Sequence, residues 1–484
     1  MTNATSSCTQ ITLQPISVAA AKTNGKGPGK IIPRLSPSKA QFNLELSLNP
    51  GQKSNEDELP QRFPAWLSEG NVQAFDVRQP QALYAAWDVF RSSKPACLLH
   101  TPLIAHLVSK WTPEYLSSAF GGVQKVEVLC AEERSSAYLD HDSEKNIYGS
   151  FYHVREPKTR RLPMTVPEFV GCLTSWSSKK LLLKAEVMHG AEGGVMAEPD
   201  KDLGQQLRSD LQTAVDWQWL KDAQQIYKWG SVSSVSLEMG SRNGLQPARY
   251  NRRDRLLAQV SGRRRILLIA PDHAHHGMYP FAWHHTYDGY AMPDLDSPDR
   301  EAWPKLGTVR GLSLVLQPGQ LLFIPAYWFA HVQDMDQATT TLVFTFSMGL
   351  RLQSQAALGL AVSRLIEERV GLAEGMADVR KWLLIIGYDD EENWLDIGTV
   401  KGYKRVVMCQ EVREEIRTVL GEQTCIKDFL LAMCDDRLQP TPWLNKDFRE
   451  PLYLTDKVLQ LPDTRSDEDI RYPELFRHRI EAAH

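Results

Sequence analysis

Apolar and β-branched residues dominate the stretch 311–348, and turn residues divide it into short runs. The pattern predicts strands over 312–316, 321–324 and 340–347, with a turn at Pro318 and Gly319 between the first two. Similar runs over 95–100, 123–129 and 232–239 predict further strands, so the chain carries a substantial β component.

Helices are predicted where a capping residue precedes an amphipathic run. Thr112 followed by Pro113 indicates one helix start, and Thr165 with Pro167 and an acidic first turn indicates another. Beyond Met348, apolar residues at helical spacing predict four more helices, over 358–366, 379–386, 408–419 and 425–434. Their apolar stripes favour packing within the chain over a surface for a protein partner or a homodimer.

Four regions follow from these patterns. They are a Ser-, Thr-, Pro- and Gly-rich tail over 1–60, a layer of strands and helices over 61–230, a strand-rich core over 231–350, and a helical region over 351–484. The first 44 residues hold five basic side chains and no acid, a composition typical of a disordered tail. A transit peptide for a mitochondrion or plastid is the alternative, although such peptides usually carry more arginine.

Composition narrows the class of protein only a little. A net charge of −4, 42% hydrophobic and 24% charged residues are ordinary for a globular protein and favour neither nucleic acid nor membrane partners. The seven cysteines include no CxxC pair, which favours reduced thiols and an intracellular location, in cytoplasm or nucleus.

One histidine stands among the aromatic residues that follow the 321–324 strand, in the segment PAYWFAH ending at His331. Spacing alone favours a hydrogen-bonded core histidine. The longer segment LQPGQLLFIPAYWFAHVQ, however, resembles the last metal-ligand strand of the cupin-like JmjC family, which includes the asparaginyl hydroxylase that inhibits hypoxia-inducible factor. The stretch 244–271 is similar to the first ligand strand of that family, and the resemblance covers roughly Lys94 to Met348.

The resemblance implies an α+β protein: a double-stranded β-helix, or jelly-roll barrel, with an N-terminal α/β layer and a C-terminal helical extension. Family members hold Fe(II) with two histidines and one carboxylate and use 2-oxoglutarate as cosubstrate. By this resemblance His331 aligns with the distal iron ligand, and Arg264 aligns with the basic residue that pairs with the 2-oxoglutarate carboxylate.

The sequence departs from the family where the first two ligands belong. Arg249 and Asn251 occupy the positions of the His-x-Asp or His-x-Glu pair, and none of the 13 histidines is followed two residues later by an acid. A guanidinium presents only donors, and its repulsion of a divalent cation at about 4 Å is on the order of 8 kcal/mol at an effective dielectric of 20. The family asparagine on the last strand is also replaced, by Phe344.

Two other clusters are candidates for binding chemistry. The segment HAHHGMYPFAWHH contains His275, His276, His284 and His285, for which a solvated loop is favoured over a metal site. Eight arginines between 242 and 265 stand against one acid, Asp254, but strand alternation prevents them from sharing one face. They indicate surface charges or an anion pocket, and no nucleic-acid motif accompanies them.

Two functions remain open. The replaced ligands favour a pseudoenzyme, a barrel that acts as scaffold or binding module with no resident cofactor, in which Arg249 and Arg264 contact an anion. The alternative is an active Fe(II)/2-oxoglutarate-dependent hydroxylase or demethylase with a rebuilt metal site that includes His331. Because one barrel hosts both enzymes and binders, the fold does not decide between them.

Overall fold

The structure is a computed structural model, and it describes residues 68–120, 125–131, 159–175, 179–190, 198–281, 285–301, 303–347, 354–374, 383, 386, 403–421 and 425–433. All of these belong to the structural unit Phe63–His484. The predicted tail over 1–60 and most of the predicted helix over 379–386 lie outside the described residues.

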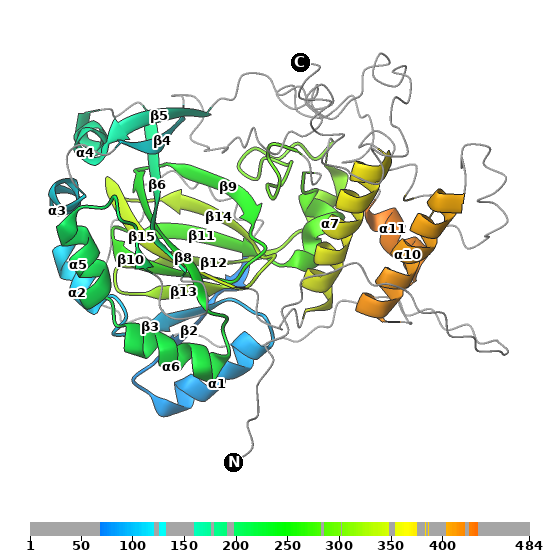
Figure 1. The fold of residues 1–484 in the computed structure, drawn as a ribbon, viewed down its shortest axis with the longest axis horizontal. Helices are drawn as coiled ribbons and strands as arrows, with labels where there is room; N and C mark the ends of the chain where they lie inside the picture. Colours follow the sequence, from blue (N-terminus) through cyan, green and yellow to red (C-terminus); the bar gives the residue numbers. More distant parts are fainter. Residues whose placement is uncertain are drawn as a thin grey trace. The chain divides into compact units, whose positions relative to one another are not determined.

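Two β-sheets form the centre of this unit (Figure 1). The smaller sheet has the strand order β1-β12-β11-β14-β9, with bounds Ser68–Asn71, Gly311–Leu316, Arg264–Ile269, Phe329–Asp334 and Leu245–Tyr250. The larger sheet has the strand order β2-β3-β13-β10-β15-β8-β6-β4-β5. Its strands are β2 (Gln73–Asp76), β3 (Ala96–Leu99), β13 (Leu321–Ile324), β10 (Arg255–Ser261), β15 (Ala338–Phe346), β8 (Val232–Ser241), β6 (Lys180–His189), β4 (Lys125–Ala131) and β5 (Thr159–Thr165). The short strand β7 (Glu198–Pro199) pairs with β6. The expected α+β jelly-roll fold is confirmed.

Side-chain alternation gives each sheet an inner and an outer face. Leu257 and Val343 of the larger sheet pack against Ile266 and Val332 of the smaller one in a shared apolar core. We call the two faces that meet in this core the lumen faces. A residue on β8, β9, β10, β11, β14 or β15 can therefore be assigned to the lumen or to the outside from its place in the ladder.

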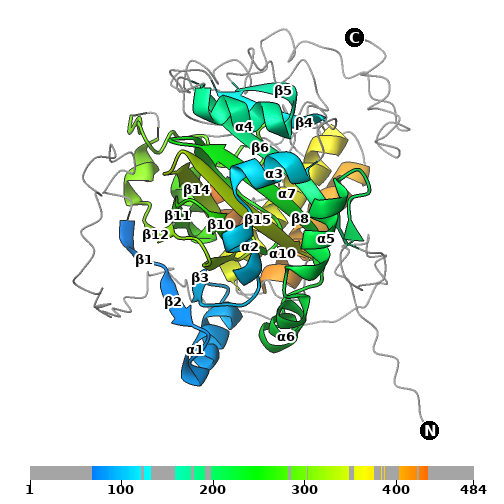
Figure 2. The same ribbon diagram turned by 90° about the vertical axis from the view of Figure 1, so that its left-hand side faces the viewer.

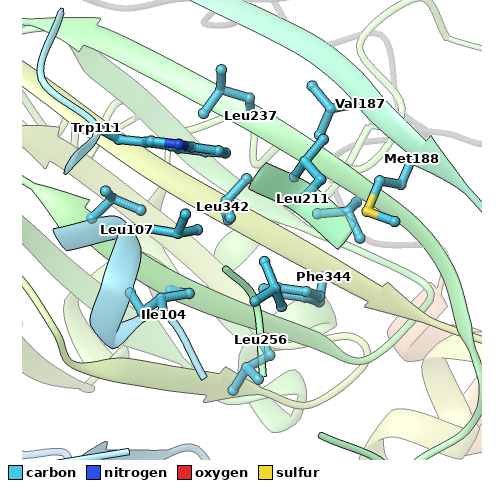
Figure 3. Packing of buried hydrophobic residues seen from close by; sticks show 14 of the residues in the cluster. Ile104, Leu107, Trp111, Val187, Met188, Leu211, Leu237, Leu256, Leu342 and Phe344 are labelled. Atoms are coloured by element: carbon cyan, nitrogen blue, oxygen red, sulfur yellow. The ribbon is translucent and has the colours of Figure 1, made fainter. Parts of the chain in front are cut away.

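Six helices cover the outer face of the larger sheet: α1 (Pro80–Arg91), α2 (Ala105–Lys110), α3 (Pro113–Ala119), α4 (Val166–Ser175), α5 (Gln205–Thr213) and α6 (Trp217–Tyr227). Figure 3 shows Leu107 of α2, Trp111 directly after α2, and Leu211 of α5 against Leu237 and Phe344 from the sheet. The helices α1 and α6 contact each other, and Figure 2 shows α1 beneath β2 and β3 and α6 beneath α5.

Both predicted helix caps are confirmed. The Thr112 hydroxyl accepts a hydrogen bond from the Tyr115 backbone N–H at 3.2 Å, and Pro113 begins α3. At the start of α4, the Glu168 carboxylate accepts the Thr165 backbone N–H at 2.7 Å, and Thr165 Oγ1 accepts the Glu168 N–H at 3.3 Å. This reciprocal pair is a capping box, which satisfies two backbone donors at the helix start.

The strands predicted between 311 and 348 are confirmed to within two residues as β12, β13 and β15, and Gly319 in the turn has a φ of +83°, which glycine adopts without strain. The sequence did not predict β14. Its residues 329–334 are all buried and lie in the smaller sheet between the central strand β11 and the edge strand β9. His331 therefore lies in the middle of a strand rather than beyond the end of one.

The outer face of the smaller sheet is covered by the segment 274–309 and by α7 (Gln355–Glu374). The short helix η5 (Pro271–His273) precedes this segment, and η6 (Ala274–Met278) and η7 (Pro304–Thr308) lie at its two ends. Ala357 and Leu360 of α7 join this apolar cluster. The buried Arg364 side chain ion-pairs with Asp288 and donates to the Phe281 carbonyl at 2.7 Å.

The packing of α7 is the intramolecular arrangement that its apolar stripe favoured. Two further helices, α10 (Tyr403–Leu420) and α11 (Ile426–Met433), lie beside α7 and η6 (Figure 1). A homodimer or a partner on these helices stays a prediction. Among the described residues, no helix is long and apolar enough to cross a membrane.

Candidate functional site

Arg249 lies near the end of β9, directly opposite Ala330 of β14 in the antiparallel ladder. Opposite residues in a ladder share a face, and Ala330 belongs to the lumen core, so Arg249 projects from the lumen face. Its guanidinium carbon stands 4.8 Å from the centre of the Tyr290 ring, a cation–π contact that fixes where the charge sits.

His331 follows Ala330 by one residue and therefore occupies the opposite face of β14. Its ladder partner is Leu267, which packs in the outer cluster beneath the segment 274–309. The imidazole is buried, and its Nε2 lies 3.5 Å from a carboxylate oxygen of Asp296 in that segment. The structure does not bring His331 together with Arg249, because the sheet separates the two side chains.

Asn251, the second expected ligand position, is engaged in the turn between β9 and β10. Its carboxamide oxygen accepts the Arg253 backbone N–H at 3.1 Å, and its backbone carbonyl accepts the Tyr327 N–H at 2.7 Å. The carboxamide thus caps the turn in the manner of an Asx turn. The oxygen that would be a weak metal ligand already accepts a hydrogen bond.

The donor groups on the lumen face at these positions do not suit Fe(II). Arg249 offers only donors, Ala330 offers no ligand atom, and the Asn251 oxygen is neutral and occupied. Across the part of the chain that the structure describes, no three His, Cys, Asp or Glu side chains are grouped as a metal site. The iron chemistry of the family has no fitting ligand set at the positions aligned with it.

Arg264 enters the lumen from β11, and carboxylates of the protein already bind it. Its Nε donates to Asp334 and its Nη1 to Glu238, both at 2.8 Å, and the side chain has no exposed surface. Thr339 donates to Asp334 at 2.6 Å, and Lys184 lies 3.6 Å from Glu238. The cation that aligns with the cosubstrate-binding residue is therefore held in an internal ion-pair cluster, here called the Arg264 cluster.

Burial and pairing oppose each other in this cluster. Burial would raise the pKa of Glu238, but Lys184 and Arg264 outweigh it and hold that pKa at about 2. Burial dominates at Asp334 and raises its pKa, although Arg264 and Thr339 favour the ionised form. For Arg264 the two carboxylates outweigh burial, and its pKa is raised. The two carboxylates therefore favour the charged form of the Arg264 guanidinium.

A glycine marks where the cluster is fitted against the backbone. Gly240 of β8 lies so close to Asp334 that a Cβ built on it would stand 1.9 Å from a carboxylate oxygen. No side chain fits at this position while Asp334 keeps its place. The close approach of β8 allows Asp334, Glu238 and Arg264 to share one small volume.

Arg255 also faces the lumen, and the sequence analysis did not identify it as part of the candidate site. It begins β10, two residues before the lumen residue Leu257, so it projects from the same face. Burial lowers the pKa of Arg255 to about 10; nearby Glu238 opposes the shift, and nearby Arg249 adds to it. The signal in the sequence was the two-residue alternation from Arg255 to Gln259, which also places Gln259 in the lumen, where it accepts from Thr341 at 2.8 Å.

The remaining arginines of the 242–265 cluster divide among several surfaces, as strand alternation predicted. Arg252 binds Asp288 at 3.0 Å, and Arg263 binds Asp336 at 2.9 Å near the protein surface. Only Arg249, Arg255 and Arg264 of the described cluster project from the lumen faces. A single basic surface is therefore absent from this part of the chain.

The solvated loop expected for the His-rich segment was wrong for the residues that the structure describes. His285 is fully buried, stacks on Phe281 with ring centres 4.3 Å apart, and accepts the Tyr287 N–H at its Nδ1 at 3.0 Å. Apolar residues alternate with the histidines in this segment, and burial of Met278, Tyr279 and Phe281 packs the segment against the sheet. His284 and the side chains of His275 and His276 lie outside the described residues.

Comparisons with known proteins agree with this architecture. Residues 86–351 match the model of the cupin-like domain family. The tRNA wybutosine-synthesizing protein 5 of Danio rerio is 28% identical over 265 residues, which is 55% of this chain and 70% of that protein, and its Gallus gallus counterpart is 25% identical over 53% of this chain and 72% of its own length. A lysine-specific demethylase of Arabidopsis thaliana is 28% identical over 28% of this chain and 23% of its own length.

The family match begins within α1 and ends just beyond β15, so it includes every strand of the two sheets except β1 and β2. It covers more than half of the 484 residues, and the strand order is that of a jelly roll. On this evidence the chain belongs to the cupin-like domain family, whose JmjC-type members the sequence motifs resemble.

Proposed function

We propose that this protein is a binding module of the cupin-like family and does not catalyse iron-dependent oxygenation. The single observation that carries the proposal is the pairing of Arg249 with Ala330 on the lumen face. One position brings a permanent positive charge to the place of a metal ligand, and the facing position brings a methyl group. Neither can hold Fe(II), and the charge would repel it.

The internal pairing of Arg264 supports the same proposal. In an oxygenase of this family the residue at this position binds the cosubstrate carboxylate, as the resemblance implies. Here Asp334 and Glu238 occupy the guanidinium, so a third carboxylate would have to displace one of them from a buried ion pair. Breaking a buried pair is costly, about 3–5 kcal/mol when one partner is removed.

The test is reconstitution of the purified full-length chain. Protein stripped with a chelator is incubated anaerobically with Fe(II) and 2-oxoglutarate, exposed to oxygen, and assayed for bound iron by elemental analysis and for succinate. We expect substoichiometric iron and no succinate above a protein-free control. Stoichiometric iron together with succinate formation would overturn the proposal.

A second candidate function rests on the His331–Asp296 pair. A buried imidazole and a carboxylate at 3.5 Å supply two of the three ligands of a facial triad, on the outer face of the sheet. A rebuilt iron site there would make the protein an Fe(II)/2-oxoglutarate-dependent hydroxylase or demethylase. The named relatives give tRNA and lysine-bearing proteins as candidate substrates for such an enzyme.

Three variants separate these candidates in the same reconstitution. If iron binds at the outer face, His331→Ala and Asp296→Asn should each remove it, whereas Arg249→Met should leave it unchanged. If the wild-type protein holds no iron, all four proteins should give the same background. Iron that is lost in His331→Ala and Asp296→Asn would support the second candidate and exclude the first.

A further inference from the structure

The cations of the lumen outnumber its carboxylates among the described residues. The side chains that project from the lumen faces or contact those that do include four cations, Lys184, Arg249, Arg255 and Arg264, and two carboxylates, Glu238 and Asp334. Lys184 and Arg264 bind the two carboxylates directly and balance them. The charges of Arg249 and Arg255 are left without a carboxylate in direct contact.

The nearby acids outside the lumen are committed elsewhere. Asp254, next to Arg255 in sequence, accepts the Ala326 backbone N–H at 2.7 Å, and burial raises its pKa. Asp288 binds Arg252 and Arg364, and Asp296 lies by His331 on the far side of the sheet. None of these carboxylates is within ion-pair distance of Arg249 or Arg255 in the structure.

The two guanidinium groups are close enough to act on each other electrostatically. The charge of Arg249 disfavours the charged form of Arg255, and the Nε of Arg255 is buried without a hydrogen-bond partner among the described residues. The Arg249 guanidinium stacks over the Tyr290 ring, a contact that favours this position of its charge. Two half-buried like charges, one of them with an unpartnered buried Nε, repel each other, and an anion between them would relieve that repulsion.

Solvent reaches this part of the lumen. On β8 the lumen residues Ser234 and Ser236 keep partial exposure, whereas the alternating outer residues Val235 and Leu237 are buried. Thr345, the ladder partner of both Ser234 and Arg255, is also half-buried and adds a hydroxyl to the same face. Water-accessible hydroxyls beside two guanidinium groups form a suitable surface for an oxyanion.

We propose that the lumen binds a small oxyanion, a carboxylate or a phosphate, between Arg249 and Arg255 without a metal ion. This inference rests on the proposed function, because an iron site at the same positions would exclude it. Each guanidinium offers a planar pair of N–H donors that matches two oxygens of a carboxylate or phosphate. The anion would also cancel the repulsion between the two arginines.

The experiment titrates the chelator-treated full-length protein with 2-oxoglutarate, citrate and inorganic phosphate separately, by calorimetry and thermal shift in EDTA at matched ionic strength. We expect at least one probe to bind, and the probe with the lowest Kd assigns the class of anion. Arg249→Met and Arg255→Met should each raise the Kd for that probe about ten-fold or more, since each removes a charged hydrogen-bond donor. Circular dichroism confirms that each variant is folded.

Arg253→Met is the matched control. Arg253 lies on the exposed turn between the two lumen arginines and carries the same charge, so its loss should change Kd less than two-fold. An equal loss of affinity in Arg253→Met would show general charge attraction and overturn the inference, as would the absence of binding by all three probes. Those outcomes leave the proposed function standing. Binding of 2-oxoglutarate that requires added Fe(II) would overturn both.

Discussion

Two groups of cations share the lumen of this barrel, and they differ in how their charge is compensated. Arg264 touches two carboxylates at 2.8 Å, and its surroundings are closed by Thr339 and by the backbone of Gly240. Arg249 and Arg255 have no carboxylate in contact and face a partly solvated surface. The first group is complete without a ligand, and the second becomes complete only when an anion is supplied.

The difference shows how a barrel can change its chemistry without changing its fold. A buried positive charge requires compensation, and a protein can supply it from within or leave it to a ligand. Both solutions appear here around the same apolar core, on β11 for Arg264 and on β9 and β10 for Arg249 and Arg255. Removal of Arg264 is therefore expected to lower the stability of the fold, whereas removal of Arg249 or Arg255 is expected to weaken anion binding.

The largest effect should follow from Arg264→Met. Removing this guanidinium leaves Asp334 and Glu238 facing each other in a buried volume with too little positive charge. Breaking a buried pair from one side costs about 3–5 kcal/mol in the free energy of unfolding. Urea denaturation monitored by tryptophan fluorescence measures this loss in the free energy of unfolding.

Arg263→Met is the neighbouring control on the protein surface. Arg263 binds Asp336 at 2.9 Å, but both side chains are about one third exposed, at 37% and 33%. Solvent screens such a pair, so its loss should cost less than about 1 kcal/mol. A cost for Arg264→Met no larger than that of Arg263→Met would show that the internal cluster does not stabilise the fold.

Acid should weaken the same cluster by a smaller amount. Burial opposes ionisation of Glu238, but Lys184 and Arg264 lower its pKa to about 2, against a reference of 4.5. Because this pKa is lower in the folded chain than in the unfolded one, ionisation stabilises the fold above pH 4.5. That contribution, about 3 kcal/mol, is lost as the pH falls from 4.5 to 2.

Denaturation curves at several pH values in wild type and Glu238→Gln isolate this contribution. The variant is less stable at neutral pH, but its free energy of unfolding should fall less steeply between pH 4.5 and 2. Parallel slopes in the two proteins would mean that Glu238 has the same pKa in the folded and unfolded chains, and that Lys184 and Arg264 do not act on it.

Local features of the sequence predicted much of the fold. The caps at Thr112 and Thr165 and the turn at Gly319 depend on neighbouring residues, and all three are found where expected. The face on which His331 lies could not be predicted in the same way. A shift of one residue moves a strand side chain to the other face, and the unbroken apolar run through Phe329 gives no alternation from which to fix the register.

The carboxylates that bind Arg264 could not be predicted from neighbouring residues in the sequence either. Glu238 and Asp334 are distant from Arg264 in sequence, and only the ladder β8-β15-β10 and the pairing of β11 with β14 bring them into one lumen. The sequence indicated that the arginines could not share one face but not which of them faced inward. For this reason Arg264 was expected at an anion site, whereas the structure places Arg255 beside Arg249.

The smallest change in stability should come from Arg255→Met. Burial lowers the pKa of Arg255 to about 10, so the folded state disfavours its charge, and the variant removes both the buried charge and its repulsion of Arg249. Methionine keeps the aliphatic stem, so little packing is lost. We expect between no change and a gain of about 1 kcal/mol in the free energy of unfolding without added anion.

In saturating phosphate or carboxylate, whichever binds, the wild type should become more stable than Arg255→Met, because only the wild type gains the free energy of binding. A loss of more than about 2 kcal/mol without anion would show that Arg255 has an internal partner, and the two groups of cations would then be alike.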